Sequence, residues 1–171
     1  MPDIFDTGAV AAVADERTTL EAFLDFYREA VKAKVRGLSE EDARRRLVPS
    51  ETTLAGLIKH LCRVELSWFQ NRLARIPLED LPALLKWIDD PEGDFRVGPD
   101  ETVETLITLY DEQCALSRQT AAKFELDEVV PHPVLGKVSL RWIYVHMIEE
   151  TARHAGHADI LREQIDGATG D

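Results

Sequence analysis

The sequence predicts an all-α protein, a four-helix bundle with a long crossover connection between its second and third helices. Apolar residues recur at three- and four-residue steps over four long segments, which is the period of helices with one buried face. Stretches rich in proline and glycine separate these segments, and the stretch at 75–99 is long enough for a crossover. No repeat or linker divides the 171 residues, so we expect one domain over 1–171.

The N-terminal part is expected to contain one long helix. Residues 1–14 are expected to form a loose lead-in to it. A helix is predicted over about 15–37, because its apolar residues fall on one face and a glycine ends the run. The polar stretch SEEDARRR at 39–46 is expected to form a short helical turn whose three arginines are a solvated face or, as the alternative, an anion contact.

The second helix is expected to start at Ser50 as N-cap and to continue to about residue 74. His60 lies at the flank of its apolar face, where a histidine is ordinarily a satisfied core or boundary residue. Cys62 is two residues further on, so it points to nearly the opposite side and cannot share a metal ion with His60. We interpret Cys62 as a small buried hydrophobic residue.

The third helix is expected to begin with Asp100 or Thr102 as its N-cap and to end near residue 124, with Cys114 packed on its inner face. One short helix around 81–87 is expected in the connection before it. A second irregular connection, with His132 exposed between two prolines, is expected at 125–138.

The fourth helix, predicted over 139–167, contains the strongest functional signal. Its core-facing stripe includes Glu150 and His154, one turn apart, with His157 beside them. An unpaired buried carboxylate is costly, so such a residue is normally paired or bound to metal. Residues four apart stack on one helix face, so Glu150 and His154 could bind one ion. The alternative is a buried polar pair, made with each other or with an arginine from another helix.

Composition excludes several classes of protein. The chain has 20 basic and 32 acidic residues and a net charge of −12, which argues against a nucleic-acid partner and against attraction to anionic membranes. No apolar run approaches the ~18–20 residues of a membrane span, and the N-terminus lacks the pattern of a secretory signal. The two cysteines make no CxxC motif and no disulfide framework. We therefore expect a cytoplasmic protein.

Three stretches resemble the DinB-like (YfiT-like) superfamily of metalloenzymes, to which the mycothiol-dependent maleylpyruvate isomerases and bacillithiol S-transferases are related. They are ERTTLEAFLDFYR, TTLAGLIKHLCRVELSWF and SLRWIYVHMIEETARHAGHADILRE, and together they span most of 16–163. The last stretch is the most specific, because it is similar to the branch with the HMIEETARHAGHAD signature. The resemblance implies a four-helix bundle with a long crossover.

The resemblance also implies a metal site, formed by one histidine of the second helix and a pair at i, i+4 on the last helix. The matching positions here are His60, Glu150 and His154. The plain DinB-like pattern has histidine in place of Glu150, and the glutamate version resembles the maleylpyruvate isomerases. His157 falls where the common HRGQ motif has its glutamine, so it is expected to line the pocket, and it is our candidate catalytic base. His157 or His146 could also substitute as a ligand.

Two imidazoles and one carboxylate leave positions open on the ion, which suits catalytic zinc and also non-haem iron or nickel. The first hypothesis is a divalent-metal-dependent enzyme. By resemblance it would be an S-transferase or isomerase that activates a low-molecular-weight thiol such as mycothiol and acts on a small molecule. The second hypothesis is metal-assisted hydrolysis with the same ligands. The third is a non-enzymatic, stress-related binding bundle with only a polar pair at this position. A homodimer through helix faces is compatible with the pattern.

Overall fold

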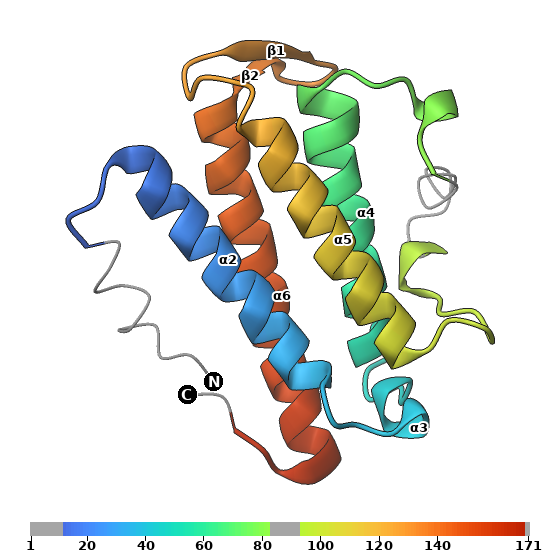
Figure 1. Cartoon of the computed structure of the whole chain (residues 1–171). Helices are drawn as coiled ribbons and strands as arrows, with labels where there is room; N and C mark the ends of the chain where they lie inside the picture. The colour runs from blue at the N-terminus through green and yellow to red at the C-terminus, as the bar shows by residue number, and fades with distance from the viewer. Residues whose placement is uncertain (1–11, 83–92, 170–171) are drawn as a thin grey trace.

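The structure is a computed structural model that describes residues 12–82 and 93–169, and it is largely helical (Figure 1). The four long helical segments are α2 (Glu16–Val35), α4 (Leu54–Glu65) with its π-helical continuation η1 (Leu66–Leu73), α5 (Val103–Ala121) and α6 (Leu140–Asp166). The short elements are α3 (Glu40–Ala43), the 3₁₀ helices η2 (Leu78–Asp80) and η4 (Gly93–Phe95), and the strands β1 (Val129–His132) and β2 (Gly136–Ser139). The prediction of a largely helical chain is confirmed. Most of the expected lead-in, residues 1–11, lies outside the described residues.

The long connection between the second and third long helices is a crossover. Helix α2 packs against α6, and α4 packs against α5 (Figure 1). Lys59 pairs with Glu101 at the start of α5, whereas Gln70 accepts a hydrogen bond from Thr120 near its end. The two helices therefore run in the same direction, and the chain returns along the molecule between them. The short helix expected around 81–87 falls largely outside the described residues.

The start of α4 differs from the prediction. The N-cap is Thr53, whose hydroxyl accepts a hydrogen bond from the Gly56 amide, and not Ser50. Ser50 belongs to the preceding loop, where its hydroxyl donates to Thr52 and its carbonyl accepts a hydrogen bond from Arg46. Either hydroxyl residue suits an N-cap in sequence, so the choice depends on the loop conformation.

The connection at 125–138 is also more ordered than predicted, because it contains an antiparallel hairpin. Val130 and Val138 are opposite each other in the register, and both side chains are buried. His132, which was predicted to be exposed, is half-buried with its ring stacked on Trp68 at 5.5 Å. Strands of four residues are too short for a clear alternating pattern, and the prolines argued for a loop.

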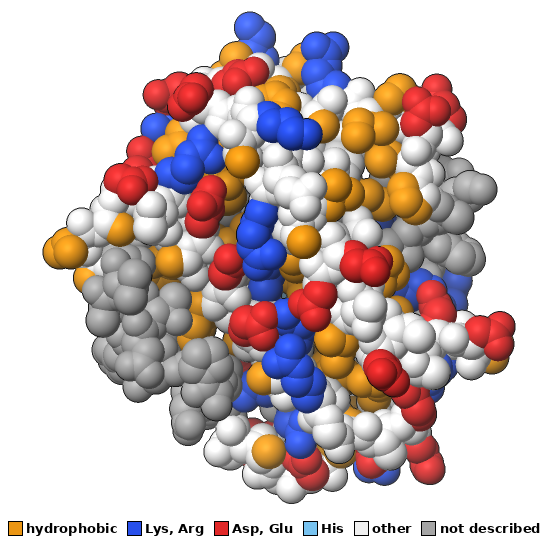
Figure 2. Space-filling model, viewed as in Figure 1, with side chains coloured by type: hydrophobic (Ala, Val, Ile, Leu, Met, Phe, Trp, Pro, Cys, Tyr) orange, Lys and Arg blue, Asp and Glu red, His pale blue; other side chains and the backbone are white. Residues whose placement is uncertain are grey.

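Ion pairs connect α2 to α5 at the surface. Basic and acidic side chains gather along the middle of the face in Figure 2. Arg118 donates to Asp25 at 2.9 Å, and Lys32 pairs with Asp111. In the described part of the chain, no helix has the length and apolarity needed to cross a membrane.

Candidate metal centre

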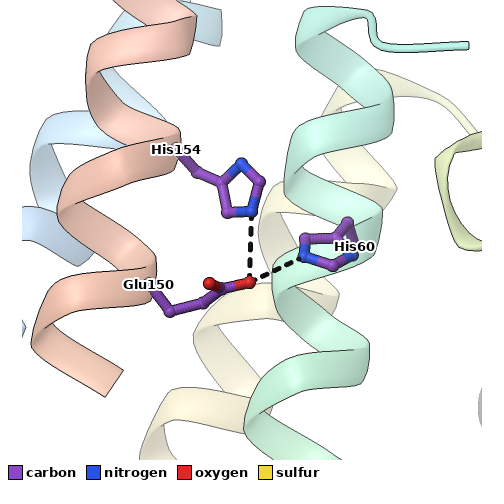
Figure 3. Close-up of side chains that lie close together, drawn as sticks. All are labelled: His60, Glu150 and His154. Atoms are coloured by element: carbon purple, nitrogen blue, oxygen red, sulfur yellow. Dashed lines mark hydrogen bonds and ion pairs between the residues drawn. The ribbon is translucent and has the colours of Figure 1, made fainter. Parts of the chain in front are cut away.

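The three predicted ligands meet where α4 faces α6. His60 comes from α4, and Glu150 and His154 come from successive turns of α6 (Figure 3). Glu150 Oε1 lies 3.2 Å from Nε2 of His60 and 3.2 Å from Nε2 of His154. One ligand atom from each residue lies within 4.8 Å of the other two. Both histidines are buried and the glutamate is half-buried. The two helices therefore bring together an imidazole–carboxylate–imidazole group.

Two of the three ligand-atom separations in this group, and its charge, suit a divalent ion. Zinc binds nitrogen and oxygen ligands at about 2.0–2.2 Å, so two ligand atoms of a tetrahedral site are about 3.3–3.5 Å apart. Both nitrogen–oxygen separations, at 3.2 Å, are close to that value. Hydrogen bonds from His154 and His60 hold the pKa of Glu150 well below its usual range, although burial opposes this shift. Glu150 is therefore an ionised carboxylate, which is the form that binds metal.

A fourth residue, Asp94 of η4, orients His60. Its Oδ2 lies 2.5 Å from Nδ1 of His60 and accepts a hydrogen bond from Nε of Arg63 at 2.6 Å. Burial alone would raise the pKa of Asp94, but the hydrogen bond from His60 and the charge of Arg63 hold it below the usual value. The carboxylate keeps a proton on Nδ1 of His60, so Nε2 can supply its lone pair. Such carboxylate–histidine pairs are common behind metal ligands.

The pKa of His60 is raised. Burial opposes the shift, but the hydrogen bonds with Asp94 and Glu150 outweigh it. Without metal, His60 can therefore hold protons on both ring nitrogens, one toward each carboxylate. A metal ion would replace the proton on Nε2 and leave the proton on Nδ1 in place.

A glycine allows η4 to approach α4 closely. A Cβ atom at Gly56 would lie only 2.5 Å from the carbonyl oxygen of Phe95. Gly56 is one turn before His60 on α4, and the Phe95 ring stacks on the His60 ring at 4.5 Å and 12°. The missing side chain thus lets the same segment provide both the Asp94 carboxylate and the stacking ring.

The other two candidate histidines lie outside this group. His157 is exposed, and its Nδ1 lies 3.4 Å from Nδ1 of His154, on the opposite side of that ring from Glu150. The ring of His146 stacks on Trp142 at 5.2 Å. Among the residues that the structure describes, the convergent group of three potential ligands includes neither His146 nor His157.

Comparisons with known proteins agree with this fold. A family model described as mycothiol-S-transferase matches residues 19–167. The chain belongs to the mycothiol-S-transferase family. This is a DinB-like family, so the resemblance seen in the sequence is confirmed. A solved structure described as a conserved protein from Enterococcus faecalis matches with a TM-score of 0.67 and 16% identity, covering 91% of this chain and 100% of that chain. At this identity the match shows a shared fold alone. No curated protein sequence matches.

If Asp94 orients a metal ligand in this mycothiol-S-transferase family member, Asp94→Asn should weaken zinc binding by about 10- to 100-fold, the usual effect of losing such a partner. Zinc affinity can be measured by competition with a chromogenic chelator. Asp100→Asn is the matched control, because Asp100 is exposed in the same connection. Equal zinc affinity in wild type and Asp94→Asn would contradict the orienting role.

Proposed function

We propose that this protein is a divalent-metal-dependent S-transferase that uses a low-molecular-weight thiol of the mycothiol type, with His60, Glu150 and His154 as the metal ligands. The observation that carries the proposal is the convergence of these three side chains from two helices. Membership in the mycothiol-S-transferase family supports the thiol and the type of reaction. We infer that the scaffold is the four-helix bundle of the DinB-like superfamily. Zinc suits the donors best, and nickel and iron also accept them.

Each residue has a specific role in this proposal. His60 and His154 present Nε2, Glu150 contributes the negative charge, and Asp94 fixes the tautomer of His60. A bound divalent ion would lower the pKa of a coordinated thiol, so that the thiolate is favoured near neutral pH. In the transfer, the S–H proton is released and the sulfur forms a bond to an electrophilic carbon. The leaving group departs from that carbon with the bonding electron pair.

His157 is proposed as the base that accepts the thiol proton by way of one water molecule, because the His154 ring lies between His157 and Glu150. Partial burial of the ring, followed by charge interactions with His154 and Arg153, lowers the pKa of His157. The ring is therefore neutral at pH 7 and able to accept a proton. Its exposed position would let the proton pass to solvent.

The proposal is tested by assaying transfer from mycothiol to a model electrophile, with the chelator-treated protein and with the same protein reloaded with zinc, nickel or iron. We expect conjugation only after reloading. Conjugation at the same rate without metal would contradict the proposal. Substrate cleavage that needs metal but no thiol would indicate metal-assisted hydrolysis instead.

Zinc affinity should also depend on pH. Because the pKa of His60 is raised in the metal-free protein, protons compete for Nε2, and binding weakens as the pH falls below that pKa. Above that pKa, Nε2 of His60 is unprotonated and protons no longer compete with zinc. A zinc titration from about pH 5 to about pH 8 should show affinity rising with pH. An affinity that does not change over this range would contradict coordination by His60.

A further inference from the structure

A cleft lies beside the proposed metal centre, between the loop before α4 and the C-terminal half of α6. Its volume is about 340 Å³, within the size range of small-molecule sites. The residues that line it are Val48, Ser50, Thr52, His157, Ile160 and Leu161. His157 belongs to both places, because its ring lines the cleft and its Nδ1 contacts His154. A molecule in the cleft would therefore be separated from His154, a proposed metal ligand, by the His157 ring alone.

The lining indicates what kind of molecule fits. Val48, Ile160 and Leu161 form an aliphatic wall, and the Ile160 side chain is 56% exposed. The six lining residues include no Asp, Glu, Lys or Arg, although the chain as a whole has a charge of −12. Ser50 donates its hydroxyl proton to Thr52, which leaves the Thr52 hydroxyl proton able to reach an acceptor in the cleft. These features favour an uncharged, mainly apolar ligand with one hydrogen-bond acceptor.

A second cavity of about 310 Å³ borders Phe95 and has a different character. Arg44 and Arg46 contribute to its lining, but their side-chain donors make hydrogen bonds to backbone carbonyl groups. Arg44 donates to the carbonyl oxygens of Val97 and Gly98, and Arg46 donates to the carbonyl oxygens of Ser50 and Pro49. We interpret these arginines as structural.

We propose that the cleft beside His157 binds the electrophilic acceptor of the transfer reaction, and that this acceptor is a compact, uncharged and largely apolar compound. The inference rests on the proposed function, because it assigns the second substrate of the same site. It places the acceptor on the His157 side of His154. The polar thiol would then bind on the other side of the His154 ring, where Glu150 and His60 meet. The apolar walls hold the acceptor by burying its surface.

The test uses 1,3-dinitrobenzene, an uncharged aromatic compound without a leaving group, and 3,5-dinitrobenzoate, its carboxylate analogue. Binding to chelator-treated protein without thiol is measured by NMR titration. The variant is Ile160→Glu. Its matched control is Val145→Glu, because Val145 is an equally exposed aliphatic residue of α6 (53%) that does not line the cleft. Val48→Trp, which fills the cleft from the loop side, is a second variant.

We expect 1,3-dinitrobenzene to bind wild type and Val145→Glu equally, and Ile160→Glu and Val48→Trp at least about tenfold more weakly. The benzoate should bind wild type more weakly than the uncharged compound. Equal binding to all four proteins, absence of binding to wild type, or tighter binding of the benzoate would overturn the inference. Because the binding experiment contains no metal and no thiol, it tests the cleft independently of whether the proposed metal site binds an ion. With 1-chloro-2,4-dinitrobenzene as acceptor, Ile160→Glu should raise the KM for the acceptor and leave the KM for mycothiol unchanged.

Discussion

Glu150→Gln is expected to weaken zinc binding and to lower kcat/KM for thiol transfer, each by more than about 100-fold. This exceeds the usual effect of removing a residue that only orients a ligand. Glutamine has the same shape and can still accept hydrogen bonds from His60 and His154, so the fold should be retained. The change removes the negative charge that lies 3.2 Å from both imidazoles. A metal ion bound by two neutral imidazoles alone loses one ligand and its charge compensation.

Glu149→Gln is the matched control for this experiment. Glu149 is the preceding residue on α6, but it is exposed and is paired only loosely with Arg153, at 3.8 Å. Zinc affinity is measured by chelator competition and kcat/KM by the conjugation assay, after circular dichroism has shown that both variants are folded. If Glu150→Gln matched Glu149→Gln in both measurements, Glu150 would not be a ligand, and the polar-pair alternative would be favoured.

Glu65→Ala should lower the free energy of unfolding by about 3–5 kcal/mol, the usual cost of leaving one charge of a buried pair without its partner. Glu65 is on α4, five residues after His60, and Arg28 of α2 donates to both of its carboxylate oxygens at 2.8 and 2.7 Å. The exposed fractions of the two side chains are 4% for Arg28 and 0% for Glu65. Asp25 gives Arg28 a second carboxylate, but it lies at the surface.

Urea unfolding measures this effect. Arg153→Ala, which removes one partner of an exposed pair on α6, should change the free energy by less than about 1 kcal/mol. The double variant Arg28→Met with Glu65→Leu should recover most of the stability, because neither charge of this pair remains buried. If Glu65→Ala lowered the free energy of unfolding by less than about 1 kcal/mol, the Arg28–Glu65 pair would contribute no more than an exposed ion pair, which would contradict its role as a buried pair.

The parts of this protein that could be predicted from sequence depend on contacts within one helix. The position of α6 followed from its apolar stripe, its serine N-cap and the terminal Gly167, which has the left-handed backbone (φ 77°) expected of a C-cap glycine. The Glu150–His154 pair followed from the four-residue helical spacing. No spacing rule connects residues 90 positions apart, so His60 was joined to this pair by the expectation that bundle sites form between facing helices and by the resemblance to the DinB-like superfamily.

The parts that were missed depend on contacts between distant segments. Asp94 lies in a connection without periodicity, and its role follows from a contact with His60, 34 positions earlier. The only sequence signal for Asp94 was the tripeptide Gly-Asp-Phe at 93–95, and this pattern is too common to indicate a site. The hairpin was missed because its buried pair, Val130 and Val138, is separated by two prolines and a glycine.

The most direct test of the central claim is the metal content of the purified protein by elemental mass spectrometry. The protein should be prepared without a histidine tag and incubated with zinc, and His60→Ala, Glu150→Ala and His154→Ala should be compared with Glu149→Ala. We expect nearly one metal ion per chain in the wild type and in Glu149→Ala, and almost none in the other three variants while they remain folded. A wild type that holds no zinc, nickel or iron, or variants that keep a full complement, would contradict the assignment of these residues as a metal site.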